Sequence, residues 1–476
     1  MSSSSLSARE RIEYLLDSNS FVEIGAAVTK RSTDFNLGAI DVCNDGVITG
    51  YGVISSTPVY VYSQDITALG GTVGEMHAKK IAALYDLAMK VGAPVIGLID
   101  CGGLRLQEAT DALDGFGTIY TKQVMASGVI PQFTAVFGKC GGALAVNTSL
   151  SDFSFIVDKQ GELFVNAPNT IDFSGNNDTG SASFQAQCGN VDFVYDSDEE
   201  LLSAMSKLIS FMPANNEDEA MYFPESDDLN RENVVNESVK DSVFILRDIS
   251  DNCEFIEVKK EFAKDMVTGF IRLNGMTVGA VANRSCVYDD EGNVTETLGE
   301  RITADGMTKA VKFIKFCDAF NIPLLSITST AGFATGLEDE KRIAREAANL
   351  TYAFANATVP KINLVTDKAF GSAYVVMNSK HIGADMMFAW NGAKIGTMES
   401  SDMAAKIMYP DITDNNILKE KAGEYDSLQQ DVTSAAKRGY VDVVIEPRFT
   451  RKNLIFAFEM LYTKREQRPD KKHGTV

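Results

Sequence analysis

Two short stretches rich in small residues are the parts of this 476-residue chain best suited to chemistry. One reads KCGGALAV and contains Gly142 and Ala143, and the other reads AFGSAYVV and contains Ser372 and Ala373. Each follows an apolar run that predicts a buried strand, and each precedes a predicted helix. Small residues at such a junction expose backbone N–H groups, and the helix dipole adds positive potential there. Such donors suit an oxyanion that develops during a reaction.

A second pair of loops repeats this arrangement. Gly102 and Gly103 closely follow the apolar run PVIGLID, while Ala331 and Gly332 closely follow PLLSIT. Small residues at these places could instead merely allow a helix to pack close to a strand. Their recurrence in both halves of the chain favours a paired site over that alternative.

The side-chain inventory offers no evident general base. Of the three histidines, none lies in the context of a nucleophile elbow, and His473 sits in a polar tail. We expect His77 to be a satisfied surface or interface residue. His381 is expected in the core or at an interface, with a place beside the site as the alternative. A substrate or cofactor would then have to supply the base.

Composition excludes several classes of protein. The net charge of −21 argues against a nucleic-acid partner, because neutralising phosphates requires clustered Lys and Arg. The seven cysteines are scattered without a CxxC pair, so we expect reduced cytosolic thiols and no zinc ribbon, disulfide framework or other metal site. No apolar run is long enough to span a membrane, and no signal peptide is visible, so a cytoplasmic location is expected.

The chain repeats itself at a spacing of 229 residues, as between Gly142 and Gly371. The matching positions are Gly46 with Gly275, Pro94 with Pro323, Gly103 with Gly332, and Gly142 with Gly371. Four anchors at one spacing predict a duplicated domain.

Each repeat predicts the same series of elements. A glycine-bearing hairpin with an Asp-Gly or Asn-Gly turn comes first, followed by a helix, a buried strand and the first small-residue loop. A second helix and strand then lead to the second loop. Apolar strands alternating with helices indicate an α/β fold. We expect domains over residues 1–225 and 241–476, joined by an acidic linker over 213–240.

Longer ordered motifs support a family resemblance. They include LSARERIEYLLDSNSFVEI, YSQDITALGGTVGEMHAKKI, DCGGLRLQEATDAL and NSKHIGADMMFAW. In these motifs the chain resembles the carboxyltransferase (beta) subunit of biotin-dependent acyl-CoA carboxylases and acyl-CoA decarboxylases. The resemblance covers nearly the whole chain and implies two crotonase-like (ββα spiral) domains.

The resemblance also implies roles for the small-residue loops. Biotin on a partner carrier would exchange a carboxyl group with an acyl-CoA, and two enolate-like oxygens would each need an oxyanion hole. By motif match, the thioester oxygen would meet the N–H groups of Gly142 and Ala143. The biotin ureido oxygen would meet those of Ser372 and Ala373. The remaining CoA- or biotin-binding positions would be Gly102, Gly103, Gly141, Gly332, Phe333, Gly371, Tyr374 and Val375.

Two departures from the family pattern bear on the site. The family usually has DVPGF where this chain has TSTAGF, from Thr328 to Phe333, which affects the expected biotin-side loop. The family also usually has Gly-Gly where this chain has Gly-Ala and Gly-Ser, but the N–H donors survive these changes. Val375 stands where the family selects acyl length, and it is compatible with acetyl-CoA or propionyl-CoA.

The resemblance leaves several functions open. The leading expectation is a carboxyltransferase that works with a biotin carboxyl carrier protein and a biotin carboxylase subunit. The alternatives are a sodium-pumping malonyl- or methylmalonyl-CoA decarboxylase with membrane subunits, and a non-catalytic scaffold of the same fold. The resemblance implies a homo-oligomer, commonly a hexamer, in which facing domains of two subunits complete each site.

Overall fold

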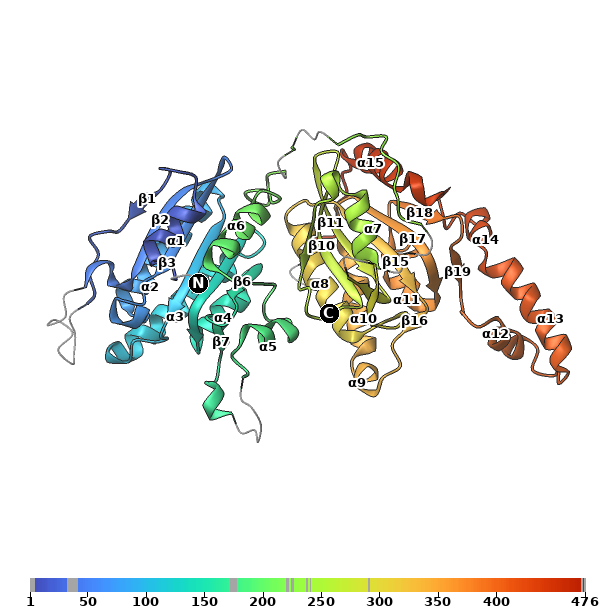
Figure 1. The fold of residues 1–476 in the computed structure, drawn as a ribbon, viewed down its shortest axis with the longest axis horizontal. Coiled ribbons are helices and arrows are strands. Elements are labelled where there is room, and N and C mark those ends of the chain that lie inside the picture. Colours follow the sequence, from blue (N-terminus) through green and yellow to red (C-terminus); the bar gives the residue numbers. More distant parts are fainter. Residues whose placement is uncertain are drawn as a thin grey trace. The chain divides into compact units, whose positions relative to one another are not determined.

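The computed structural model divides the chain into two compact units, Met1–Met221 and Tyr222–Val476 (Figure 1). It describes residues 5–31, 42–171, 178–219, 222–223, 227–236, 239, 241–289, 292–471 and 474. No helix among these residues is both long enough and apolar enough to cross a membrane.

The first unit is built on one sheet with the strand order β1-β2-β3-β4-β5-β6-β8, and β7 pairs with β5. The first three strands pair antiparallel, and from β3 onward the pairs are parallel. The strands are β1 (Val22–Ile24), β2 (Val47–Ile54), β3 (Thr57–Gln64), β4 (Val95–Cys101), β5 (Gln132–Gly141), β6 (Phe153–Val157), β7 (Glu162–Phe164) and β8 (Phe193–Tyr195). The helices are α1 (Ala8–Leu15), α2 (Glu75–Val91), α3 (Ala109–Ala126), α4 (Ala143–Leu150), α5 (Ala182–Gln187) and α6 (Asp198–Ile209).

The second unit repeats this topology in the order β9-β10-β11-β15-β17-β18-β20, with β19 paired to β17. Two small sheets, β12 with β13 and β14 with β16, are added to it. Its strands are β9 (Phe255–Val258), β10 (Met266–Leu273), β11 (Met276–Asn283), β12 (Cys286–Tyr288), β13 (Val294–Thr297), β14 (Arg301–Ile302), β15 (Leu324–Thr330), β16 (Gly332–Phe333), β17 (Lys361–Phe370), β18 (Met386–Trp390), β19 (Lys394–Gly396) and β20 (Val443–Ile445). Its helices are α7 (Ser242–Ile249), α8 (Ala304–Ala319), α9 (Leu337–Glu340), α10 (Ile343–Asn356), α11 (Gly371–Val376), α12 (Ser401–Met408), α13 (Asn415–Tyr425), α14 (Val432–Lys437) and α15 (Thr450–Leu461).

The shared strand order confirms the predicted duplication, but one of its four anchors is wrong. The spacing of 229 holds for β4 with β15, for β5 with β17 and for the starts of α2 and α8. Gly46 precedes β2, whereas Gly275 lies in the turn between β10 and β11, so these glycines are not equivalent. The segment between β11 and α8 is ten residues longer than that between β3 and α2, and it holds β12 and β13.

The two hairpin turns also differ in sequence. In the second unit the turn is Asn274-Gly275, as expected, with φ values of 50° and 78°. In the first unit it is not Asp45-Gly46 but Ser55-Ser56, with φ values of 48° and 72°. Both turns need two residues with positive φ, which matches the twist of the strands. Serine is sterically disfavoured at positive φ, so Ser55-Ser56 carries no turn signal in the sequence.

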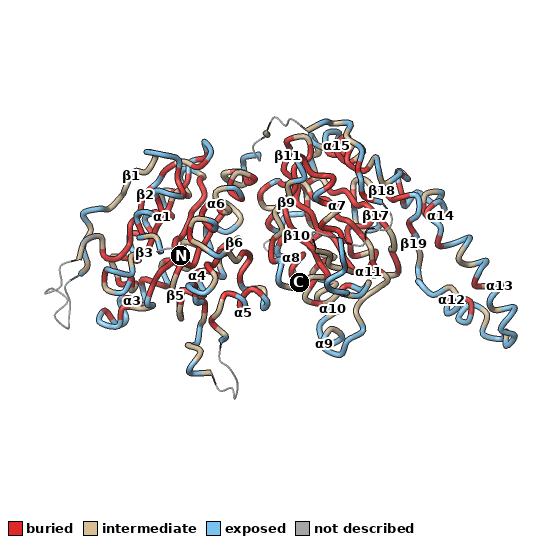
Figure 2. The backbone as a smooth tube through the Cα atoms, viewed as in Figure 1, coloured by how far each residue is buried: buried red, intermediate tan, exposed pale blue. Residues whose placement is uncertain are grey.

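Each unit has its own apolar core around the parallel strands (Figure 2). All seven residues of β4 are buried, as expected for a strand covered on both faces. On α2, the core-facing side chains Ala78, Ile81, Tyr85 and Ala88 follow the helical period. A capping box begins α1, because Ser7 and Glu10 bond each other's backbone N–H groups.

Part of the expected linker belongs to the second unit, because its described residues 227–236 pack within that unit. Asn233 donates its backbone N–H to the Arg448 carbonyl at 2.8 Å, and its side-chain oxygen accepts from the Arg451 N–H at 2.8 Å. Arg231 pairs with Asp227 at 3.0 Å. The acidic charge that suggested a solvated segment is therefore partly neutralised within the unit.

Candidate active site

A pocket of about 330 Å³ in the second unit joins the two predicted small-residue loops. It is lined by Arg301, Ala331, Gly332, Phe333, Phe370, Gly371, Ser372, Ala373, Thr397, Met398, Glu399, Ser400 and Met403. The loops meet because β15 and β17 are parallel neighbours, and Thr330 pairs with Ala369 at their C-terminal ends. Tyr374 and Val375, also predicted for this site, are not among the lining residues.

The start of α11 supplies the N–H groups of this pocket. Gly371 has a φ of 63°, a conformation that glycine adopts without steric cost. No side chain caps the helix. The N–H groups of Ser372 and Ala373 donate to no other described residue, as expected in the first turn of a helix.

The first unit has the same arrangement at α4, but the expected donor Gly142 is replaced by Leu144. Gly142 has a φ of 61°, but its N–H donates to the Phe164 carbonyl at 2.8 Å, so it is not available to a substrate oxygen. The next two N–H groups, those of Ala143 and Leu144, have no acceptor in the described part of the chain. At the spacing of 229, these two residues are the counterparts of Ser372 and Ala373.

Gly141 and Gly103 shape the backbone around α4. Phe164 lies on β7, which pairs with β5, and its ring would lie 2.8 Å from a side-chain carbon on Gly141, so a larger residue there would have to displace the ring. No described atom lies within 4 Å of where a side chain on Gly103 or Gly142 would begin. Space is therefore open in front of both loops of the first unit, which the pairing of Cys101 with Cys140 brings to one sheet edge.

The first loop of each unit is held by the same local contact. In the second unit, the Thr330 hydroxyl accepts from the Gly332 N–H at 3.2 Å and donates to the Gly332 carbonyl at 3.0 Å. In the first unit, the Cys101 sulfur makes the equivalent contacts to Gly103 at 3.3 and 3.5 Å. The TSTAGF sequence thus retains a defined loop, with a hydroxyl in the place of the thiol.

The two units hold their site helices by different means. In the first, α3 does so: the Tyr120 hydroxyl donates to the Ala143 carbonyl at 2.7 Å, and Gln123 donates to the Asn147 carbonyl at 3.1 Å. In the second, a fully buried network on the sheet holds the end of α11. Asn363 donates to the Asn378 carbonyl at 2.9 Å and accepts from the Thr328 hydroxyl at 3.1 Å.

A buried charge cluster, missed from the sequence, supports the Gly102-Gly103 loop. Arg105 is ion-paired with Asp45 at 2.6 Å and with Glu108 at 2.9 Å, and all three side chains are almost fully buried. Arg105 also donates to the Thr72 carbonyl at 2.7 Å. The cluster ties the loop to the segments that precede β2 and α2. Arg105 and Glu108 are three residues apart, but Asp45 and Thr72 lie far from them in sequence, so no local pattern predicted the cluster.

The histidines and thiols near the loops do not offer a base or nucleophile. His77 is buried rather than at the surface, and burial lowers its pKa to about 3. Its Nδ1–H donates to the Asp45 carbonyl at 3.0 Å, and Nε2 accepts from Gln64 at 3.2 Å. Burial raises the pKa of Cys101 and of Cys140 to about 12, so both are protonated thiols.

His381 lies outside the core, so of its two expected places the core is wrong. It is exposed and packs between the rings of Tyr374 and Tyr440, with centroids 5.8 and 4.7 Å away. Tyr374 is itself buried in the cluster beneath α11. No group of three or more His, Cys, Asp or Glu in the described residues could hold a metal ion.

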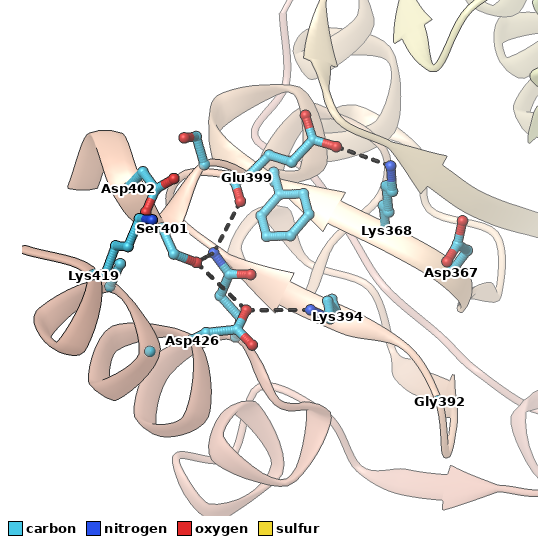
Figure 3. A pocket seen from close by; sticks show the side chains of 14 residues that line it. Asp367, Lys368, Gly392, Lys394, Glu399, Ser401, Asp402, Lys419 and Asp426 are labelled. Carbon is cyan, nitrogen blue, oxygen red and sulfur yellow. Dashed lines mark hydrogen bonds and ion pairs between the residues drawn. The ribbon is translucent and has the colours of Figure 1, made fainter. Parts of the chain in front are cut away.

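A larger pocket of about 800 Å³ adjoins the first one and shares Phe370, Glu399 and Ser400 with it (Figure 3). Its walls carry both signs of charge. Lys368 pairs with Glu399 at 2.9 Å, and Lys394 pairs with Asp426 at 3.2 Å. The pocket thus extends the small-residue site along a polar surface formed partly by α12 and α13.

Comparison with known proteins places the chain in a family. The model of the carboxyl transferase domain matches residues 2–476. Methylmalonyl-CoA decarboxylase subunit alpha of Propionigenium modestum is 39% identical, over 100% of this chain and 93% of that protein. Propionyl-CoA carboxylase beta chain of Roseobacter denitrificans is 38% identical, over 99% of this chain and 93% of that protein.

A solved structure agrees. The crystal structure of transcarboxylase 12S, a hexamer with methylmalonyl-coenzyme A bound, has a TM-score of 0.92 and is 35% identical. The match covers 99% of this chain and 92% of that one. The duplicated crotonase-like fold, the paired small-residue loops and these similarities agree: the chain belongs to the carboxyl transferase family and is a biotin-dependent acyl-CoA carboxyltransferase.

Proposed function

We propose that this chain moves a carboxyl group between carboxybiotin on a carrier protein and a short-chain acyl-CoA, with propionyl-CoA and methylmalonyl-CoA as its substrate pair. The observation that carries this proposal is the matched pair of helix starts. Each unit presents two successive unengaged N–H groups, Ala143 and Leu144 in one and Ser372 and Ala373 in the other. The choice of acyl group rests on relatives named for propionyl-CoA and methylmalonyl-CoA.

The site residues divide the work between the units. When its carrier is bound, biotin supplies the carboxyl group and the base that takes the α-proton of the acyl-CoA. The Ala143 and Leu144 N–H groups would stabilise the charge that develops on the thioester oxygen. Ser372 and Ala373 would stabilise the ureido oxygen. Because biotin would supply the base, no side-chain base is needed, in line with the inert His77, Cys101 and Cys140, and preorganised donors would stabilise the charge on both oxygens.

Gly142 contributes in a different way from the one expected. Its N–H is held by Phe164, so we propose that it sets the direction of Ala143 rather than donating to substrate. Gly102, Gly103 and Gly141 would shape the CoA side, and Gly332, Phe333 and Gly371 the biotin side. The buried Tyr374 would anchor α11 to the core. Its neighbour Val375 remains our proposed contact for the acyl chain.

A direct assay tests the reaction. The purified chain is incubated with methylmalonyl-CoA and a biotinylated carrier or biocytin, and the decarboxylated CoA product is followed. We expect turnover that depends on biotin and favours methylmalonyl-CoA over malonyl-CoA by roughly 10- to 200-fold, the range for one buried methyl group. Absence of biotin-dependent turnover with any short acyl-CoA would refute the proposal.

The same site could work in the reverse direction, inside a decarboxylase. The 39% identity to a methylmalonyl-CoA decarboxylase subunit favours this second candidate. Co-purification from the native source distinguishes the two. A biotin carboxylase partner supports carboxylation, and a membrane-embedded partner supports decarboxylation. We also propose a hexamer, by analogy with transcarboxylase 12S, which light scattering after size-exclusion chromatography would test.

A further inference from the structure

Arg301 is a cation near Ser372 and Ala373 that has no ion-pair partner among the described residues. It lies on β14 and lines the 330 Å³ pocket. Its guanidinium donates to the Phe333 carbonyl at 3.2 Å. No carboxylate of the described residues forms an ion pair with it. Four of its five N–H donors therefore remain for a ligand.

The carboxylates near Arg301 are already engaged. Glu300 and Glu399 both pair with Lys368, the latter at 2.9 Å. Glu399 is the other ionisable residue that lines the pocket. Lys368 shares its one positive charge between these two carboxylates, so Arg301 balances the charge of the four side chains, and it is the cation that lines the pocket together with Ser372 and Ala373.

Arg301 contacts the first loop. Its Nη1 would lie 3.0 Å from a side-chain carbon on Gly332, so the guanidinium rests against bare backbone. The φ of 146° at Gly332 favours glycine there. β14 pairs with β16, and Arg301 lies directly opposite Gly332 in that pairing. The loop thus contacts the guanidinium and forms part of the pocket wall.

We propose that Arg301 binds the carboxylate of carboxylated biotin, an assignment that rests on the proposed function. A planar guanidinium matches a carboxylate with two parallel hydrogen bonds. The uncarboxylated ureido ring is neutral and gains little from the cation. As the N–C bond breaks, its electron pair moves to the ureido group, whose oxygen faces Ser372 and Ala373, and CO2 leaves as a neutral molecule. Arg301 therefore favours binding of the charged form more than its breakdown.

The test compares the carrier with and without its carboxyl group. Arg301→Gln removes the charge, Arg301→Lys keeps it without the planar fork, and Arg342→Gln is the control. Arg342 is 47% exposed, is paired with Asp305 and does not line the pocket. KM for the carboxylated carrier is measured in transfer to propionyl-CoA, and KM for the uncarboxylated carrier in transfer from methylmalonyl-CoA. Surface plasmon resonance of both carrier forms, without acyl-CoA, gives the affinities directly.

We expect Arg301→Gln to weaken affinity and raise KM for the carboxylated carrier by about tenfold, with twofold or less change for the uncarboxylated form. Arg301→Lys should fall between, and Arg342→Gln should match the wild type. Equal changes for both carrier forms, or none, would overturn the assignment. A wild-type protein that binds the carboxylated carrier more tightly through Arg301 but transfers nothing would refute the proposed function and leave the assignment standing.

Discussion

Replacing Ala143 by proline removes one proposed oxyanion donor and changes little else. Ala143 is the first residue of α4, where proline fits because its fixed φ suits a helix start and no intrahelical bond is lost. The residue before a proline is sterically restricted, and here it is Gly142, which tolerates unusual conformations. The Ala143 carbonyl keeps its hydrogen bond from Tyr120.

The expected loss is large for the reaction and small for the fold. Removing one preorganised oxyanion donor costs about 2.7–4 kcal/mol, or roughly 10²- to 10³-fold in kcat. Ala143 makes no other polar contact through its N–H, so the free energy of unfolding should change by less than about 1 kcal/mol. The assay measures kcat for transfer from methylmalonyl-CoA to biocytin, alongside urea unfolding.

Asn415→Pro is the matched control. Asn415 is the exposed first residue of α13 and follows Asp414, whose extended ψ of 115° accommodates a following proline. This variant should keep wild-type kcat. If Ala143→Pro loses less than about tenfold in kcat, or if its loss comes with unfolding, the N–H group does not act as proposed.

The remaining predictions concern the surroundings of the site. Asn363→Leu should lower kcat at least tenfold and destabilise the protein by about 1–3 kcal/mol, because its buried partners lose their hydrogen bonds; unchanged kcat in a folded variant would contradict a positioning role. Thr330→Val should raise KM for the biotin carrier several-fold while Thr330→Ser restores it, and equal KM values would show that the hydroxyl is dispensable. His77 has a folded pKa of about 3, below its ordinary 6.5, so the folded state binds fewer protons in that window and stability falls as pH falls. His77→Gln removes this titration. The difference in unfolding free energy between the wild type and this variant, measured by urea titration, should therefore fall by about 1.4 kcal/mol per pH unit from pH 6 to 4.

The parallel strands and the second loops followed from local patterns. Apolar runs, Pro94 and Pro323, and the small residues after each strand are all contiguous signals. The hairpin turn of the first unit did not, because Ser55-Ser56 carries no glycine, and an inserted hairpin in the second unit shifted the spacing by ten residues. Asp45-Gly46 then offered a false match to Asn274-Gly275.

The donor pair of the first unit could not be read from sequence either. Whether the Gly142 N–H is free depends on Phe164, which reaches it because β7 pairs with β5. The same limit applied to the Arg105 cluster and to the burial of His77, which depend on contacts between distant segments. Arg301 belongs to no recognisable motif, and we inferred its role from its place in the pocket and from the absence of an ion-pair partner among the described residues.

The different supports of α4 and α11 have a consequence for how such a protein can change. A duplicated enzyme that braced both helices through one shared network could not alter one half without disturbing the other. Here Tyr120 and Gln123 belong to a surface-facing helix, while Asn363 and Thr328 lie within a sheet. The unit that we propose binds acyl-CoA can therefore be altered through α3 without changing the Asn363 network of the unit that we propose binds biotin.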